Sequence, residues 1–220
     1  MLGPRLNPLR LALIGMSGSG KTFWANRLAE AGHPVISCDA RIEERLRAEL
    51  RPGGHRGTEG VAAWMGWPDR GTYPERAAKY LAAEVAVMDE TLTALERDPA
   101  RELVLDTTGS VVYTGEAVGA RLRRLVTVVY FEASPEEQAL LIARYVCVPK
   151  PVLWRDAYRP LEGEAASETV GRCFPALLEE RRRLYEVWAH CVLPIRVLRD
   201  GALDAARLLT LIQQNCRCAE

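Results

Sequence analysis

The chain has 220 residues, of which 48% are hydrophobic and 26% charged, and its formal net charge is zero. This length and composition predict a single globular α/β domain over residues 1–220, and the neutral charge does not favour nucleic acid or an anionic membrane as a partner. No apolar run approaches the about 18 residues of a transmembrane helix, and the start of the chain lacks the apolar core of a secretory signal, so we expect a cytoplasmic protein.

Strand-like and helix-like patterns alternate along the chain, which predicts a parallel sheet with helices on both faces. In chain order, the expected elements are a strand at 10–14, a helix at 23–30, a strand at 35–37, a helix at 39–50, a loop at 51–72, a helix at 74–96, a strand at 102–106, a helix at 116–124, a strand at 125–131, a helix from 134 to about 145, a Pro- and Gly-containing segment at 147–166, a mostly helical stretch at 168–190, a strand at 192–198 and a helix at 203–215.

Three stretches depart from a regular alternation of strands and helices. The glycine-rich stretch 51–72 is long for a connector, and long loops of this kind tend to be lids or binding loops. The segment 147–166 is a second candidate for a mobile part of the molecule. Pro175 is expected to kink or break the helix over 168–190, because proline lacks the N–H that an interior helical position donates.

The first predicted strand runs into a glycine-rich motif of the form G-x-x-x-x-G-K-[ST], which a helix follows at once. In this context the backbone N–H groups converge on a phosphate, and the helix N-terminus adds its dipole. The lysine reaches the β- and γ-phosphates of ATP, and the threonine hydroxyl ligates Mg²⁺. The predicted ATP-binding residues of the motif are Gly15, Met16, Ser17, Gly18, Ser19, Gly20, Lys21 and Thr22.

Asp106 directly follows a buried strand, and it is the expected second magnesium ligand beside Thr22. An acid at this position lies at the carboxyl edge of a parallel sheet, close to the phosphate loop. The alternative is a turn aspartate in the sequence Asp-Thr-Thr-Gly, where aspartate is common.

Asp39 stands after the second predicted strand, at another carboxyl edge. A carboxylate there is placed to orient or deprotonate an acceptor hydroxyl. Its alternative role is the N-cap of a helix over 40–50, and the two roles are compatible.

The order and spacing of four segments resemble those of shikimate kinase, over nearly the whole chain. These segments are residues 13–22, 39–43, 133–137 and 180–189. The resemblance implies a three-layer α/β/α P-loop fold of the nucleoside-monophosphate-kinase-like group. Such a fold has a five-stranded parallel sheet, a substrate-binding insertion, here at about 40–98, and a mobile lid, here at about 147–166.

The resemblance also implies roles for individual residues. Asp39 would contact the acceptor hydroxyl, and Arg181 would match the arginine that binds the substrate carboxylate. Arg144 would pack near the adenine, and Lys150 would match a lid arginine. For Arg181, the alternative is a solvated charge within a run of three arginines on a helix.

The acceptor half of the motif set departs from the shikimate kinase pattern. Ser37 stands where the family carries an aspartate, and Leu81 replaces the arginine of the Phe-Arg-x-x-Glu segment, which here ends at Glu84. The family's glycine triplet is reduced to Gly109 and its neighbours, so Glu84 and Gly109 remain as candidate substrate-binding residues. Tryptophans at 64, 67 and 154 either stack on a planar substrate or pack beneath a lid.

These residues predict an ATP-dependent kinase that phosphorylates a hydroxyl of a small molecule, with Lys21, Asp39 and Lys150 as catalytic residues and with ATP and Mg²⁺ bound. One alternative is a nucleotide-binding regulatory module of degenerate kinase fold without transferase activity. Another is a kinase that acts on a nucleotide or a nucleic-acid end. The sequence leaves open the identity of the acceptor and the oligomeric state.

Overall fold

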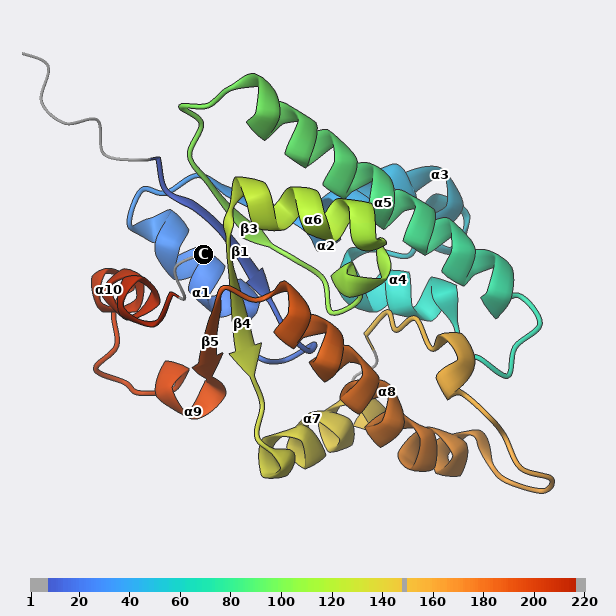
Figure 1. Ribbon diagram of the computed structural model, residues 1–220. Coiled ribbons are helices and arrows are strands. Elements are labelled where there is room, and N and C mark those ends of the chain that lie inside the picture. Colours follow the sequence, from blue (N-terminus) through green and yellow to red (C-terminus); the bar gives the residue numbers. More distant parts are fainter. Residues whose placement is uncertain (1–7, 148–149, 217–220) are drawn as a thin grey trace, which may run out of the picture.

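A parallel five-stranded sheet forms the centre of the part of the chain that the structure describes (Figure 1). This computed structural model describes residues 8–147 and 150–216, without the side chains of 144, 146 and 147. The strand order is β2-β3-β1-β4-β5, and every neighbouring pair is parallel. The strands are β1 (Arg10–Ile14), β2 (Val35–Ser37), β3 (Leu103–Asp106), β4 (Thr127–Glu132) and β5 (Cys191–Pro194).

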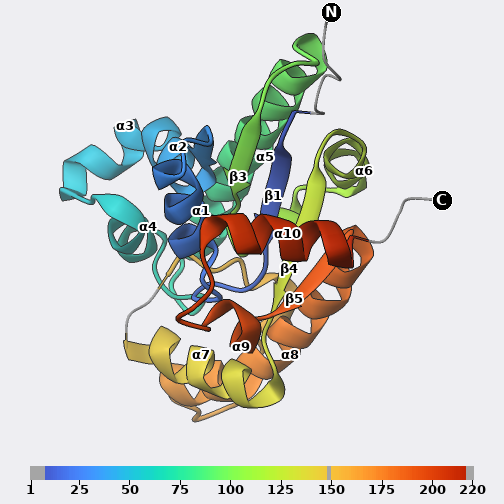
Figure 2. The ribbon, with the colours of Figure 1, turned by 90° about the vertical axis from the view of Figure 1, so that its left-hand side faces the viewer.

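Helices cover both faces of the sheet, so the expected three-layer α/β/α fold is confirmed (Figures 1 and 2). Residues alternate between the faces, as strand geometry requires: Leu11 and Leu13 pack in one core with α1 and α10, while Ala12 and Ile14 pack in the other with α5, α6 and α8. The helices are α1 (Lys21–Glu30), α2 (Cys38–Arg45), α3 (Arg47–Leu50), α4 (Gly57–Met65), α5 (Tyr73–Arg97), α6 (Glu116–Leu125), α7 (Pro135–Cys147), α8 (Ala166–Trp188), α9 (Ile195–Leu198) and α10 (Ala205–Asn215).

The insertion between β2 and β3 consists of helices, and it includes one that the sequence did not predict. The stretch 51–72, expected as a loop, contains α4 over Gly57–Met65. Val61, Trp64 and Met65 of α4 are buried in the core shared with α2 and α5, so tertiary packing stabilises a helix despite its glycines. Figure 2 shows α2, α3 and α4 of this insertion on one flank of the sheet.

Two further expectations were wrong in detail. The predicted strand at 192–198 pairs only as far as Pro194, which has no N–H for a ladder, and the chain then turns into the short helix α9. α8 does not break at Pro175: it continues from Ala166 to Trp188, and the buried residues Phe174 and Leu177 on both sides of the proline anchor it to the core.

The connection from Lys150 to α8 packs back on the insertion. The Tyr73 hydroxyl donates to the carbonyl oxygen of Val152 over 2.8 Å and accepts from the N–H of Trp154 over 2.9 Å. Val152, Leu153 and Trp154 are all buried, which fixes the start of the segment that the sequence predicts as a lid. Among the described residues, none of the helices is both long and apolar enough to span a bilayer.

Candidate active site

The phosphate-loop motif connects the end of β1 to the start of α1, as the sequence predicts. Gly15 has φ +142°, and a Cβ there would lie 2.8 Å from the carbonyl oxygen of Phe131, so a side chain does not fit. Gly20 is the N-cap of α1 in the left-handed region, with φ 99°. The loop therefore brings the first N–H groups of α1 to the carboxyl edge of the sheet.

Lys21 lies inside this loop. Its Nζ atom donates to the carbonyl oxygens of Gly15 and Met16 over 2.8 and 2.9 Å, and the side chain is buried. Burial lowers the pKa of Lys21, while the nearby carboxylates of Asp106 and Asp39 act in the opposite direction. The buried Lys21 ammonium group is suited to donate hydrogen bonds to an anionic ligand at the phosphate loop.

Asp106 and Thr22 form an oxygen-rich pair below the loop. Asp106 ends β3 in register with Leu13 of β1, and its buried Oδ1 atom has no hydrogen-bond partner among the described residues. Burial raises the pKa of Asp106, and the Lys21 charge and a hydrogen bond with Thr22 oppose the shift.

Asp106 and Thr22 offer the oxygen ligands that a magnesium ion prefers. Mg²⁺ prefers oxygen ligands and is commonly held by one or two carboxylates together with substrate phosphates and water. Within residues 8–147 and 150–216 there is no cluster of three or more His, Cys, Asp or Glu side chains able to hold a metal unaided. The unpartnered Oδ1 of Asp106 and the Thr22 hydroxyl would then be the protein's ligands.

Asp39 lies in the first turn of α2 and faces the phosphate loop. Ser37, not Asp39, caps α2, because the Ser37 hydroxyl accepts from the N–H of Ala40 over 3.3 Å. Burial raises the pKa of the Asp39 carboxyl, Lys21 and Lys150 lower it, and Asp106 raises it further. Its carboxylate is therefore available to a bound molecule.

One cavity of about 210 Å³ gathers most of the predicted site residues. Lys21, Thr22, Asp39, Gly109, Lys150 and Arg181 line it, together with Ser17, Gly18, Gly20, Phe23, Thr58, Tyr80, Thr107, Thr108 and Pro151. Asp106 and Glu84 are buried behind this lining. The side chain of Arg144 lies outside the described residues.

The sequence interpretation missed Thr58 and Tyr80 as cavity residues. Thr58 reaches the cavity from the first turn of α4, and no pattern predicted that helix. Tyr80 matches the Phe of the family's Phe-Arg-x-x-Glu pattern, and nothing in the sequence indicated a function for this position.

Glu84 lies behind the acceptor side of the cavity, on α5. Its carboxylate accepts hydrogen bonds from the hydroxyls of Thr108 and of Ser110, the latter over 2.8 Å. Burial raises the pKa of Glu84 to about 7, although the hydrogen bonds from Thr108 and Ser110 oppose this shift. Glu84 therefore holds the turn at 108–110, and Gly109 within that turn lies against the phosphate loop, where a Cβ would be 3.2 Å from the N atom of Ser17.

Arg181 is a buried cation, not the solvated helix charge that its sequence context suggested as an alternative. Its Nη2 donates to the carbonyl oxygen of Leu153 over 3.0 Å, and its guanidinium lies 5.1 Å from the ring centre of Tyr113. Among the described residues it has no acidic partner within ion-pair distance, and its Nε has no hydrogen-bond partner. A buried guanidinium with free donors favours an anionic group in the cavity.

Lys150 approaches the cavity from the predicted lid. Its Nζ lies 3.5 Å from a carboxylate oxygen of Glu59 on α4, and both side chains are partly or largely exposed. This ion pair connects the segment after α7 to the insertion across the mouth of the cavity.

A second cavity, of about 570 Å³, lies on the other side of the phosphate loop. It extends from Gly18 and Gly20 to the connection between β5 and α10, and α7 supplies Leu140 and Leu141. Trp24 and Arg27 of α1 complete the wall. Its position places room for a large group next to the phosphate site.

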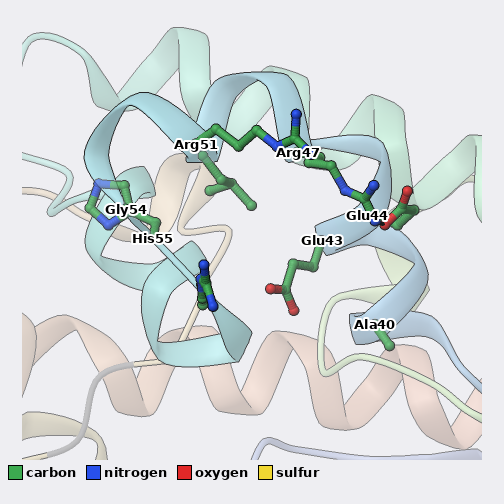
Figure 3. Close-up of a pocket in the computed structure, with 9 residues that line it drawn as sticks. Ala40, Glu43, Glu44, Arg47, Arg51, Gly54 and His55 are labelled. Atoms are coloured by element: carbon green, nitrogen blue, oxygen red, sulfur yellow. Dashed lines mark hydrogen bonds and ion pairs between the residues drawn. The ribbon is translucent and has the colours of Figure 1, made fainter.

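A separate pocket of about 470 Å³ lies on the insertion, between α2, α3 and the approach to α4 (Figure 3). Glu43 projects into it, and the Glu43 carboxylate accepts from the N–H of Gly57 over 2.7 Å, which satisfies one of the free donors at the start of α4. None of the predicted site residues lines this pocket. The hydrogen bond between Glu43 and Gly57 instead fixes the start of α4, the helix that carries Thr58.

The glycine loop between β1 and α1, its buried lysine and the strand order define the class as a P-loop phosphate-binding fold. Solved structures of shikimate kinases have the same fold. The shikimate kinase from Acinetobacter baumannii in complex with shikimate is 26% identical, with TM-score 0.57, covering 95% of this chain and 96% of its own. The enzyme from Bacteroides thetaiotaomicron is 20% identical, with TM-score 0.58 and coverage of 94% and 97%.

A curated relative gives the same result in sequence. A shikimate kinase of Paracidovorax citrulli (strain AAC00-1) is 33% identical over 138 residues, which are 62% of this chain and 61% of the relative. The chain thus matches less than two thirds of the length of this relative. No protein-family model matches the chain. The chain therefore has a shikimate kinase-like fold, as the sequence motifs predict.

Proposed function

We propose that the protein is an ATP-dependent kinase that transfers the γ-phosphoryl group to a hydroxyl of a small molecule. The observation that carries this proposal is the single cavity where Lys21, Thr22, Asp39 and Lys150 meet. Phosphoryl transfer needs a phosphate cradle, an acceptor-orienting group and positive charge around the transferred group. The similarity to shikimate kinases supports the same class of reaction.

The loop amides and Lys21 would bind the β- and γ-phosphates. The hydrogen bonds from the Lys21 ammonium to the carbonyl oxygens of Gly15 and Met16 would be exchanged for charged hydrogen bonds to phosphate oxygens. Thr22 and Asp106 would hold Mg²⁺, which neutralises charge on the phosphates when bound. The nucleoside would extend into the cavity beside Trp24.

Asp39 would orient the acceptor hydroxyl. As the acceptor oxygen forms its bond to the γ-phosphorus and the bond from that phosphorus to the β–γ bridging oxygen breaks, the hydroxyl proton would pass to the Asp39 carboxylate. A pKa raised by burial makes this carboxylate a stronger base than an exposed aspartate. Lys150, which already lines the cavity, would place its positive charge near the transferred group.

The acceptor site supports an acceptor with an anionic group but argues against shikimate. Arg181 is buried, lines the cavity and retains free donors, which favours a carboxylate or phosphate on the acceptor. Leu81, at the position of the family's second arginine, packs against the core. Each charged hydrogen bond that shikimate would lack here is worth about 1.5–3 kcal/mol.

The test is a coupled assay of ADP release with Mg²⁺ and ATP. The acceptors are shikimate, other hydroxylated acids, sugars and nucleosides, and the Lys21→Ala protein serves as the blank. Acceptor-stimulated ADP release that disappears in the blank is expected. ATP binding without acceptor-stimulated release from any of these compounds would contradict the proposal and favour a nucleotide-binding regulatory module.

A further inference from the structure

An apolar cavity of about 360 Å³ adjoins the catalytic cavity, and the proposed kinase reaction does not use it. It lies between the phosphate loop, α7, the segment after Lys150 and α8. Its apolar lining consists of Met16, Leu141, Tyr145, Val152, Phe174 and Leu178.

The two cavities meet at four shared residues, which are Ser17, Gly18, Lys150 and Arg181. One end of the apolar cavity is therefore cationic and borders the place where the acceptor hydroxyl would lie. The rest of its lining consists of apolar and aromatic side chains. A molecule that reached both would carry its polar groups at one end and an apolar group at the other.

The walls of the apolar cavity are held in place by contacts that do not involve a ligand. Tyr145 is stacked on Phe174 with 4.7 Å between ring centres, and Trp154 packs behind both. The Tyr73 hydroxyl fixes Val152 through its carbonyl oxygen. Side chains anchored in this way cannot collapse into the space without losing these contacts.

The size of the cavity identifies the kind of group that fits. Protein interiors contain few voids larger than a water molecule, and an apolar cavity of about 150 Å³ is enough to bind benzene. The 360 Å³ found here accommodates a six-membered ring with its linking carbons. The aromatic pair Tyr145 and Phe174 offers edge and face contacts to such a ring.

We propose that the acceptor is an amphipathic hydroxy acid, whose apolar ring-sized group binds in this cavity while its acid group lies at Arg181 and its hydroxyl at Asp39. This inference rests on the proposed kinase function for the role of the bound molecule. The binding site itself rests only on the geometry of the two cavities. The nucleoside is assigned to the cavity beside Trp24, which shares Gly18 and Leu141 with the apolar cavity but contains neither Lys150 nor Arg181.

The experiment is isothermal titration calorimetry of the full chain with matched pairs of 2-hydroxy acids. Mandelate, 3-phenyllactate and 2-hydroxy-4-phenylbutyrate place a phenyl ring at increasing distance from the hydroxyl, and each is compared with the straight-chain acid that lacks the ring. At least one phenyl acid is expected to bind about tenfold to hundredfold more tightly than its partner, because the ring is buried. The preference is expected to persist with MgADP bound.

Substitutions then locate the ring. Leu178→Phe and Leu178→Trp add volume inside the cavity and are expected to reduce the phenyl preference toward onefold. Val187→Phe adds a ring at an exposed position of the same helix and is expected to preserve the preference. Circular dichroism and thermal unfolding establish that each variant is folded, and the milder Leu178→Phe remains informative if Leu178→Trp does not fold.

Three results would overturn the inference: no phenyl preference in the wild-type protein, a preference that survives both Leu178 variants, or a preference that MgADP abolishes. The ADP-release assay separates this outcome from failure of the proposed function. Phenyl-selective binding that Leu178→Trp removes, without ADP release, would retain the site and reject the kinase reaction. Acceptor-stimulated ADP release without phenyl selectivity would retain the kinase reaction and reject the apolar binding site.

Discussion

The Nζ atom of Lys21 donates a 2.8 Å hydrogen bond to the carbonyl oxygen of Gly15, so the lysine is held within its own phosphate loop. We predict that Lys21→Met lowers acceptor-stimulated ADP release by at least about 100-fold, because a fixed charge at the transferring phosphoryl group is lost. Lys79→Met, at a partly exposed lysine away from the cavity, is the matched control and is expected to retain the rate. Equal rates in both variants would contradict the assigned role.

Asp39→Asn is predicted to lower kcat by about 100- to 1,000-fold while MgATP affinity stays within about threefold, since the amide cannot accept the hydroxyl proton. In the wild-type protein the rate is expected to fall as the pH drops through the pKa of Asp39. Because burial raises this pKa, the fall begins at a higher pH than for an ordinary aspartate. Glu44→Gln, exposed on the same helix, is the control. A variant with unchanged kcat would exclude Asp39 as the base.

Asp106→Asn is predicted to raise the Mg²⁺ concentration needed for half-maximal ADP release by about tenfold or more. Removing one of two proposed protein ligands weakens the metal site, whereas the phosphate loop still binds ATP. A magnesium titration of the rate, together with ATP binding measured in EDTA, separates the two effects. The same magnesium dependence in both proteins would show that Asp106 is not a ligand.

Glu84→Gln is predicted to change how stability depends on pH. The folded pKa of about 7 lies above the usual 4.5, so between these values the folded state binds more protons than the unfolded state. The free energy of unfolding that this group contributes is then present at low pH and lost as the pH rises through 7. Urea unfolding near pH 5 and pH 8 should show a decrease of about 2.5 kcal/mol in the free energy of unfolding of the wild-type protein relative to the variant. Parallel pH curves would contradict the shift.

Gly119→Ala is predicted to destabilise the protein by about 1–3 kcal/mol, because the new Cβ would lie 2.5 Å from the Trp188 ring and force a core helix apart. Gly171→Ala provides the opposite control. No atom lies within 4 Å of its Cβ position, so alanine should stabilise α8 by about 0.5–1 kcal/mol. Chemical denaturation of both variants measures the change in the free energy of unfolding. A Gly119→Ala variant as stable as the wild-type protein would mean that α6 and α8 can move apart without loss of stability.

The central fold was predictable because its signals are local. Strands β1 to β4 are apolar runs, the glycine loop has a fixed form, and α5 begins beside Pro74 as expected for a helix start. Helix α4 was missed because Gly57 and Gly60 lower local helix propensity, and only the burial of Trp64 and its neighbours outweighs that effect. The end of β5 at Pro194 was missed because apolar residues continue beyond it.

The candidate site was predictable where sequence position alone fixes location. Asp106 ends β3, and Lys21 and Asp39 lie in the first turns of the helices that follow β1 and β2, so their convergence at the carboxyl edge follows from a parallel sheet. The burial of Arg181 did not follow, because a run of three arginines gives no indication of which one turns inward. Trp154 packs against Phe174 and Tyr158 and does not line the catalytic cavity, which agrees with packing beneath the predicted lid.

The insertion between β2 and β3 joins the sheet at its edge, since β2 is the outermost strand. This keeps α2, α3 and α4 apart from the central strands of the sheet. Substitutions on the cavity side of α2 or α4 can remodel what surrounds Asp39 and Thr58 while the β1–β3 and β1–β4 pairings that support the glycine loop stay intact. A new substrate preference can thus arise at the edge of the sheet without a change in its central strands.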